Sequence, residues 1–378
     1  MKQIPVLQAD LSIFRGSRCA VTGAGGTVGA ELCSQLLALG AAEVRGLDNS
    51  ETALWNLEKS VVSEKFNCFL VDVCNQGHLD RHFQNIDFVF HGAALKHVPF
   101  CEKQPHAAIE TNVRGVECVI DAAIKCDVRR VLFTSSDKAV NSTNLMGATK
   151  FVGERIMTAA NNFSATGSST KFASTRFGNV AMSNGSVIPL FIEQIKRGAP
   201  LTITDREMTR FMMSVAQSVS LVIESLALMQ GGEVFVTKMP VIQIGDLADV
   251  LVEELGHDLE RYPVNIVGSR PGEKLYEELT TDEEIPRSYV FDDLIVVVPA
   301  FRNIYGSIDF TIYEKGGKLE HGYNSHNESY MTKPQIFEFL STLGLFCGDD
   351  VVEDAVKFVA LKGPETQLQM AEAGANLD

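Results

Sequence analysis

The first 180 residues alternate short apolar runs with longer amphipathic stretches, and this alternation constrains the possible folds more than any other feature of the chain. Short runs that are apolar throughout are typical of strands buried on both faces, as in a parallel sheet covered by helices. We therefore predict an α/β fold with a doubly wound parallel sheet of the Rossmann type. The expected strands are 19–23, 43–48, 69–73, 88–94, 129–136 and 171–180, and the expected helices are 28–39, 54–62, 108–126 and 148–161.

The pattern changes after residue 180. We expect a loop, a helix and a short strand in 184–205, a helix in 214–229, a strand in 233–240 and an amphipathic helix in 244–255 with Asp246 in its first turn. These later elements predict a smaller C-terminal lobe that is interleaved with the sheet. The expected parts are a cofactor-binding domain of residues 1–183 plus about 212–243, a substrate-binding lobe of about 184–211 plus 244–345, and a flexible tail at 363–378.

Composition restricts the classes of function. With 33 Lys and Arg against 48 Asp and Glu, the formal net charge is −15, which argues against nucleic-acid binding because that needs a basic surface. The 8 cysteines include no CxxC pair, as expected for reduced thiols in a cytosolic protein. We see no signal peptide and no run that approaches the ~20 apolar residues of a membrane span. We expect a soluble, cytoplasmic protein without membrane insertion.

A glycine-rich turn follows the first expected strand. Gly23, Gly26 and Gly29 have the spacing GxxGxxG between a strand and a helix, a variant of the dinucleotide-binding fingerprint. Glycines let the backbone approach a pyrophosphate, which the helix N-terminus then binds through its N–H groups. Asp48 ends the second strand, where a carboxylate can accept both adenosine ribose hydroxyls and would repel a 2′-phosphate. NAD is therefore favoured over NADP, and a loop-capping role for Asp48 is the alternative.

Several sequence blocks carry a resemblance to a known family. They lie at 22–29, 91–99, 111–115, 135–150, 176–180, 184–191, 204–213 and 268–279. With these blocks the chain resembles the extended short-chain dehydrogenase/reductase group, and more closely the UDP-N-acetylglucosamine 4,6-dehydratases of bacterial polysaccharide and glycan biosynthesis. The resemblance implies a bound NAD, a UDP-sugar substrate and homo-oligomers. It implies cofactor contacts at Gly23, Gly26, Thr27, Val28, Gly29, Asp48, Asn49, Val73, Ala93, Ala94, Asn112 and Lys150. Asp72 is a further candidate from its place at the end of the third expected strand, where it could bind the adenine amino group, and a solvated strand-end acid is the alternative.

The resemblance also implies catalytic roles. A 4,6-dehydratase moves hydride from C4 of the sugar onto NAD⁺, removes the C5 proton, expels the C6 hydroxyl as water and returns the hydride to C6. Asp137 is then the acid at the C6 oxygen and Lys138 the base at C5. Each role needs a shifted pKa, because free Asp and Lys titrate near 3.9 and 10.4. A buried Asp137–Lys138 ion pair is the structural alternative, although the two side chains would point to opposite faces if the strand continued.

Met146 stands where related enzymes carry a tyrosine, and a thioether cannot deprotonate a hydroxyl. Some branches of the dehydratase family resemble this chain in that respect, and there the aspartate–lysine pair is thought to cover the missing base. We expect Met146 to pack beside the sugar or the nicotinamide, Ser136 to bond the O4 hydroxyl, and Lys150, one helical turn after Met146, to hold the nicotinamide ribose. The outcome at C5 stays open, with Met146 favouring retention over inversion.

Arginines that match the family's diphosphate and ribose contacts complete the expected site. Arg210 and Arg270 suit phosphate because a planar guanidinium grips two oxygens, and Glu273 would bind the uridine ribose. The other expected substrate residues are Lys96, Asn179, Ser186, Val187, Thr202 and Thr204. For each single residue a surface salt bridge or a loop cap is the alternative. His91 and His97 are interpreted as satisfied structural histidines, and no cluster has metal-binding spacing.

Two competing functions remain from the sequence. A UDP-hexose 4-epimerase shares the fold and the cofactor, but it relies on a tyrosine at position 146 and does not need the Asp137–Lys138 pair. A catalytically silent module that binds NAD or a nucleotide sugar would explain the missing tyrosine. Retention of Asp137, Lys138, Lys150 and the arginines counts against it.

Overall fold

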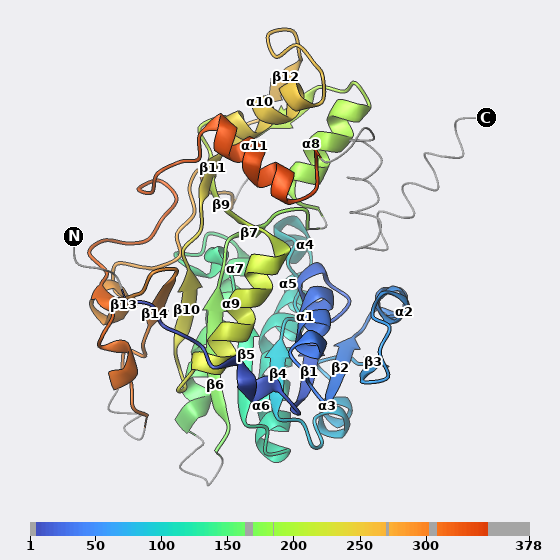
Figure 1. Ribbon diagram of the computed structural model, residues 1–378, viewed down its shortest axis with the longest axis vertical. Coiled ribbons are helices and arrows are strands. Elements are labelled where there is room, and N and C mark those ends of the chain that lie inside the picture. The colour runs from blue at the N-terminus through green and yellow to red at the C-terminus, as the bar shows by residue number, and fades with distance from the viewer. Residues whose placement is uncertain (1–4, 163–168, 184, 270–271, 302–307, 347–378) are drawn as a thin grey trace. The chain divides into compact units, whose positions relative to one another are not determined.

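The computed structural model describes residues 5–162, 169–183, 185–269, 272–301 and 308–346, and these form two compact units (Figure 1). The first unit comprises the described residues up to Phe177 together with Ala216–Lys238 and Glu278–Tyr323. The second comprises Gly178–Val215, Met239–Glu277 and the described residues from Asn324 onward. The division differs from the predicted one, because residues 278–323 belong with the large sheet and not with the smaller lobe.

A mixed sheet forms the centre of the first unit. Its order is β15-β13-β14-β10-β6-β5-β4-β1-β2-β3, and all neighbours from β10 to β3 are parallel. This confirms the predicted doubly wound fold, while the antiparallel edge of β14, β13 and β15 was not predicted. The strands are β1 Arg18–Thr22, β2 Glu43–Asp48, β3 Phe66–Leu70, β4 Phe88–His91, β5 Arg130–Thr134, β6 Lys171–Arg176, β10 Val234–Thr237, β13 Ser288–Val290, β14 Leu294–Val297 and β15 Gly317–Lys318.

Helices cover both faces of this sheet, since successive strand residues point to opposite sides. On one face, Phe90 and Leu132 share a core cluster with Leu36 of α1 and Val222 of α9. On the other face, strand residues pack against side chains of α3, α6 and α7. The helices are α1 Thr27–Ala38, α2 Glu51–Ser60, α3 Gln76–His82, α4 Val98–Lys103, α5 Pro105–Ile109, α6 Gly115–Lys125, α7 Leu145–Ala160 and α9 Val215–Leu228.

Two predicted elements are interrupted. The helix expected over 108–126 is divided into α5, a π-helical turn Glu110–Arg114 and α6, and such turns are frequent at functional sites. The strand expected over 171–180 ends at Arg176, and Asn179–Val180 is a separate strand, β7, of the second unit. The break falls at Gly178, where a Cβ atom would lie 2.6 Å from the Cβ of Phe211, so that the backbone itself packs against the neighbouring strand.

The second unit has two small sheets and its own core. One sheet has the order β11-β9-β7, and the other pairs β12 with β8 in parallel. Its core brings together Phe191, Met212, Leu251 and Phe339. The elements are β7 Asn179–Val180, α8 Val187–Lys196, β8 Leu201–Ile203, β9 Thr209–Met213, β11 Val241–Gln243, α10 Ile244–Glu254, β12 Val264–Ile266 and α11 Lys333–Thr342. Asp246 lies in the first turn of α10, as predicted.

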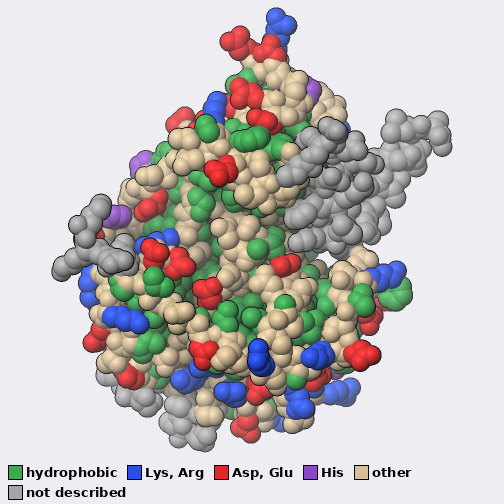
Figure 2. Space-filling view, viewed as in Figure 1, with side chains coloured by type: hydrophobic (Ala, Val, Ile, Leu, Met, Phe, Trp, Pro, Cys, Tyr) green, Lys and Arg blue, Asp and Glu red, His purple; other side chains and the backbone are tan. Residues whose placement is uncertain are grey.

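The surface is charged and mixed. On the face shown in Figure 2, Lys and Arg side chains are interspersed with Asp and Glu side chains. Among the described residues, none of the helices is both long enough and apolar enough to cross a membrane. The predicted tail at 363–378 lies outside the described residues.

Candidate active site

The glycine turn lies between β1 and α1, as the fingerprint requires. Gly23 has a φ of +71°, and a Cβ atom on it would lie 2.7 Å from the backbone nitrogen of Ala93. A Cβ atom on Gly29 would overlap the carbonyl oxygen of Gly23. Gly26 is the N-cap of α1 and contributes no side-chain cap, so the N–H groups of the first turn are donors that an anion can use. The turn therefore has the form of a pyrophosphate cradle.

Asp48 lies beside this turn at the end of β2. Its Oδ2 accepts a hydrogen bond from the backbone nitrogen of Gly25, and its Oδ1 accepts one from Ser50, both at 2.9 Å. The loop-capping interpretation of Asp48 is thus seen in the structure, and the same carboxylate is also fixed next to the glycine turn. In dinucleotide-binding folds, a carboxylate at the end of the second strand is the residue type that bonds a ribose and disfavours a 2′-phosphate.

The other predicted cofactor residues differ in what they can offer. Thr27 and Val28 open α1, Ala93 and Ala94 follow β4, and Asn49 and Asp72 are exposed, Asp72 two residues after β3. Val73 is buried against Gly115. Asn112 is buried in the π-helical turn, and its amide bonds both backbone groups of Leu95 and the Thr149 hydroxyl. Asn112 thereby holds the segment after β4 against α7.

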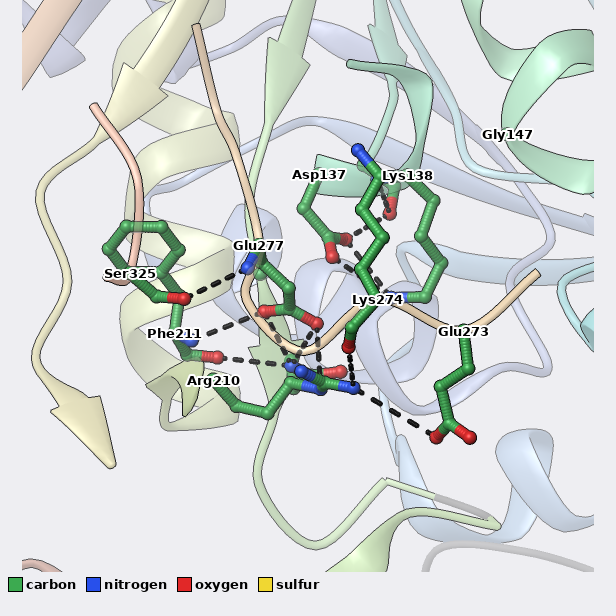
Figure 3. A network of polar contacts seen from close by, with 12 residues as sticks. Asp137, Lys138, Gly147, Arg210, Phe211, Glu273, Lys274, Glu277 and Ser325 are labelled. Carbon is green, nitrogen blue, oxygen red and sulfur yellow. Dashed lines mark hydrogen bonds and ion pairs between the residues drawn. The ribbon is translucent and has the colours of Figure 1, made fainter. Parts of the chain in front are cut away.

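The predicted acid and base form an ion pair. Strand β5 ends at Thr134, and Ser136 caps a 3-10 turn, Asp137–Ala139, by accepting from the backbone nitrogen of Lys138. The Lys138 ammonium lies 3.0 and 3.2 Å from the two oxygens of the buried Asp137 carboxylate (Figure 3). The ion pair is the structural alternative that the sequence left open, and the condition for side chains on opposite faces is not met, because the strand does not continue. The Ser136 hydroxyl also donates to Asp137.

Lys150 is buried on α7, and is not a solvated helix lysine. Its ammonium donates to the carbonyl oxygen of Thr134 at 2.9 Å and lies 4.5 Å from the centre of the Phe133 ring. Burial lowers the pKa of Lys150 to about 8, although the Glu154 carboxylate one turn further opposes this shift. A lysine with such a pKa keeps its charge at neutral pH and holds it close to the end of β5.

Met146 is buried one turn before Lys150. It packs in a small apolar cluster with Cys101 and Ala108, which partly buried Leu95 and Val98 adjoin. The side chain therefore joins α7 to α4, α5 and the segment after β4. Position 146 offers no proton acceptor, as the sequence indicated.

His91 is only half satisfied, which corrects the sequence interpretation. Its Nδ1 lies 2.7 Å from the Thr22 hydroxyl oxygen, while its Nε2 is buried without a hydrogen-bond partner among the described residues. Burial lowers the pKa of His91 to about 3, and the Lys150 charge adds to this shift, so the imidazole is neutral. His97 is an exposed residue at the N-cap of α4. The described residues contain no group of His, Cys, Asp and Glu that could hold a metal ion.

The second unit holds most of the predicted substrate residues. Asn179 opens β7, Arg210 lies in β9, and Glu273 precedes a segment whose backbone carbonyls meet the Arg210 guanidinium. Ser186 and Val187 lie at the start of α8, whereas the Thr202 hydroxyl accepts from Gln194 of that helix. Thr204 follows β8. Lys96 is exposed in the first unit, and Arg270 lies outside the described residues.

Sequence reasoning missed two buried charge networks. In the second unit, Glu277 pairs with Arg210 and bonds Asn179 (Figure 3). In the first unit, Arg176 pairs with Glu154 and Glu284. Both arginines lie in sequence blocks that carried the family resemblance, but their partner carboxylates lie at distances along the chain that no local spacing reveals.

The strand order β3-β2-β1-β4-β5-β6, with a glycine turn after β1 and a carboxylate at the end of β2, defines a dinucleotide-binding α/β protein. A sequence profile described as "Polysaccharide biosynthesis protein" matches residues 19–299, and the chain belongs to that family.

The named relatives include both a dehydratase and an epimerase. The chain is 37% identical to a Campylobacter jejuni protein named "UDP-N-acetylglucosamine 4,6-dehydratase (inverting)", over 72% of this chain and 81% of the relative. It is 36% identical to a Rickettsia conorii protein named "UDP-glucose 4-epimerase", over 91% and 99% of the two chains. It is 42% identical to the "Uncharacterized membrane protein MJ1061" of Methanocaldococcus jannaschii, over 88% and 98%.

A solved structure agrees with the fold over most of the chain. The X-ray structure of Pen from Bacillus thuringiensis matches with a TM-score of 0.80 at 36% identity, and the match covers 87% of this chain and 98% of that chain. The similarity includes both units, because 87% exceeds what either unit alone could supply.

Proposed function

We propose that the protein is an NAD-dependent 4,6-dehydratase of UDP-N-acetylglucosamine, which makes a 4-keto-6-deoxy sugar nucleotide for polysaccharide or glycan biosynthesis. The observation that carries this proposal is the Ser136–Asp137–Lys138 group at the end of β5. Removal of water across C5 and C6 needs an acid and a base side by side, whereas epimerisation at C4 needs neither at C6. An apolar Met146 in the tyrosine position fits the first reaction better than the second.

The residues of the first unit fit an NAD cofactor. The cradle at Gly23 and Gly29 has no room for a side chain, α1 begins without a side-chain cap, and Asp48 stands where a 2′-phosphate would be repelled. When bound, NAD accepts hydride from C4 of the sugar and returns it to C6. Lys150 would hold the nicotinamide ribose and keep a positive charge beside it.

The chain's own groups supply the proton transfers. The O4 hydroxyl would give its proton through Ser136 to the Asp137 carboxylate, because the Ser136 hydroxyl is already bonded to Asp137. Protonated Asp137 would then deliver that proton to the departing C6 oxygen. Lys138, in its neutral form, would take the C5 proton and later return it. Asp137 thus gains a proton from O4 and gives it up at O6, and Lys138 gains and later returns the C5 proton, so both groups end the cycle as they began it.

A UDP-hexose 4-epimerase is the second candidate, and the Rickettsia relatives are the observation in its favour. Against it, Met146 is packed into an apolar cluster and has no acid or base to offer. The experiment that separates these two functions also decides between retention and inversion at C5. The Campylobacter relative is named as an inverting enzyme, whereas the loss of tyrosine favours retention in this chain.

The deciding experiment is incubation of the purified protein with UDP-N-acetylglucosamine in D₂O without added reductant, followed by proton NMR and mass spectrometry. Loss of one water, a C6 methyl signal and deuterium at C5 would support the dehydratase, and the couplings at C5 would distinguish retention from inversion. Appearance of the C4 epimer would favour the epimerase. Unchanged substrate in spite of bound NAD and saturable UDP-sugar binding would indicate a silent module.

A further inference from the structure

Glu277 is nearly fully buried in the second unit, yet its carboxylate is surrounded by donors. The Asn179 amide nitrogen donates to both of its oxygens, at 2.9 and 3.0 Å, and the backbone nitrogen of Phe211 donates at 3.2 Å. The Arg210 Nε lies 3.2 Å from Oε1. Glu277 therefore joins strands β7 and β9 through Asn179 and Arg210, two residues that the sequence predicts to bind the UDP-sugar.

The backbone of Glu277 is fixed as firmly as its side chain. The backbone nitrogen of Ser325 donates to the carbonyl oxygen of Glu277 at 2.8 Å, and the Ser325 hydroxyl accepts from the Glu277 nitrogen at 2.9 Å. The same hydroxyl lies 2.8 Å from the Thr209 hydroxyl, so the support extends to β9. Because both the backbone and the carboxylate of Glu277 are bonded, its side chain is held in one position. Figure 3 shows the carboxylate next to the Arg210 guanidinium, with Ser325 bonded to the Glu277 backbone.

This position determines how Arg210 presents its donors. With Nε held by Glu277, the guanidinium plane is fixed and the two terminal nitrogens face backbone oxygens, and one of them also lies 3.9 Å from the Glu273 carboxylate. One donates to Thr209 at 2.8 Å and to Leu275 at 3.3 Å, and the other donates to Lys274 at 2.9 Å. Carbonyl oxygens are neutral acceptors, and a phosphate oxygen forms about twice as strong a hydrogen bond with a guanidinium. The terminal nitrogens are thus oriented donors that a diphosphate can take over.

Asn179 is oriented by the same carboxylate. Its amide nitrogen donates to Glu277 and, at 3.3 Å, to the carbonyl oxygen of Phe211. Because the nitrogen is used in this way, Oδ1 is the group that Asn179 can offer to a ligand. An oxygen acceptor suits a sugar hydroxyl or an acetamido N–H, and it does not suit a phosphate.

We propose that Glu277 is the positioning residue of the nucleotide-sugar subsite, which sets Arg210 for the diphosphate and Asn179 for the sugar while taking no part in the proton transfers. This inference rests on the proposed function, since it assigns a residue to the substrate side of that reaction. It predicts a defect in substrate affinity and not in turnover. If glutamine replaces Glu277, one of its two oxygens becomes an amide nitrogen, which is a donor. That nitrogen would face a donor of Arg210 or of Asn179, and we expect both side chains to lose their orientation.

The test compares Glu277→Gln with the neighbouring Glu278→Gln as a matched control. Glu278 is half-buried and its carboxylate accepts from the Asn141 amide, so its substitution removes the same charge from the next position without touching Arg210. For both variants and the wild type, we would measure the UDP dissociation constant by calorimetry, kcat and KM for UDP-N-acetylglucosamine, bound NAD and the melting temperature. Glu277→Asp, which keeps the charge, carries the test if Glu277→Gln does not fold.

We expect Glu277→Gln to weaken UDP binding and raise KM by about tenfold to a hundredfold, with kcat within threefold and NAD content unchanged. Glu278→Gln should stay within twofold of the wild type. For Glu277→Asp we expect an intermediate KM. Equal behaviour of the Glu277 and Glu278 variants would overturn the inference, and so would a loss of kcat at unchanged KM. A wild-type protein that binds no UDP would instead overturn the proposed function.

Discussion

Two arginines that are largely shielded from solvent, one in each unit, differ in the partners that hold them. Arg176, at the end of β6 in the first unit, has a side chain that is 1% exposed and pairs with the carboxylates of Glu154 and Glu284. Arg210, in β9 of the second unit, is 12% exposed and pairs closely with one carboxylate, that of Glu277. Its other close acceptors are backbone carbonyls, and the Glu273 carboxylate lies further away, 3.9 Å from a terminal nitrogen.

The acceptors explain the difference. All five hydrogen bonds of Arg176 are short, and four of them end on carboxylate oxygens, the fifth on the carbonyl oxygen of Leu279. A ligand anion would have to displace a charged partner, which costs far more than displacing a neutral one. Arg210 can exchange carbonyls for phosphate oxygens and still keep Glu277. The comparison indicates that an arginine largely shielded from solvent can take up an anionic ligand when most of its close acceptors are neutral carbonyls, and not when most are carboxylates.

The largest expected effect is on stability. Arg176→Met leaves the Glu154 carboxylate buried without its ion-pair partner and Glu284 with Arg287 alone, 3.6 Å away, and we expect the free energy of unfolding to fall by about 3–5 kcal/mol. Arg210→Met leaves one carboxylate that Asn179 and Phe211 still bond, so its loss of stability should be clearly smaller. Urea unfolding of both variants checks the order. Equal losses of unfolding free energy in the two variants would contradict the view that Arg176 serves stability more than Arg210 does.

Low pH should weaken the ion-pair network of Arg176, Glu154 and Glu284 in the first unit. Burial by itself would raise the pKa of Glu284, but the charge and hydrogen bonds of Arg176 lower it from 4.5 to about 2. A carboxylate with a depressed pKa in the folded state stabilises the protein above about pH 4.5 and loses this contribution as the pH falls through 2. The difference in pKa corresponds to about 3 kcal/mol. We expect Glu284→Gln to be less stable than the wild type at pH 6 and to lose less stability between pH 6 and pH 3, as measured by urea midpoints.

A milder substitution sharpens the comparison in the second unit. Arg210→Lys keeps the charge but removes the planar fork, so it cannot hold Glu277 and a diphosphate together. We expect UDP binding to weaken by about tenfold, which is about 1.4 kcal/mol, with little change in the melting temperature. Lys274→Arg, at a residue that contributes its carbonyl to Arg210, is the matched control and should bind UDP as the wild type does. An unchanged affinity of Arg210→Lys would exclude a bidentate role for Arg210.

The features that the sequence predicted well depend on residues that are close together along the chain. The apolar runs of β1, β2 and β4 and the glycine turn are local, and they specify the parallel sheet and the cradle. The antiparallel edge was missed because β13 and β15 are short and have no apolar alternation long enough to recognise. The geometry of Asp137 and Lys138 was missed because the Ser136 cap turns the chain out of the strand direction. Apart from the carbonyl of Thr209, the partners of Arg210 lie more than sixty residues further along the chain, and only tertiary packing brings them together.

The smallest expected effect comes from two buried serines that support the acidic partners. Ser325 bonds the backbone of Glu277, and Ser288 donates its hydroxyl to the carbonyl oxygen of Glu284 at 2.7 Å. Both side chains are fully buried, so replacing either by alanine should cost about 1 kcal/mol of stability. The two variants should differ in function. Ser325→Ala frees the backbone of a residue that orients Arg210 and Asn179, and we expect a severalfold weaker affinity for UDP. Ser288→Ala supports a closed network and should leave UDP binding unchanged. If both variants bind UDP like the wild type, the position of Glu277 is set by its side chain alone, and the backbone support from Ser325 serves stability in the second unit as Ser288 does in the first.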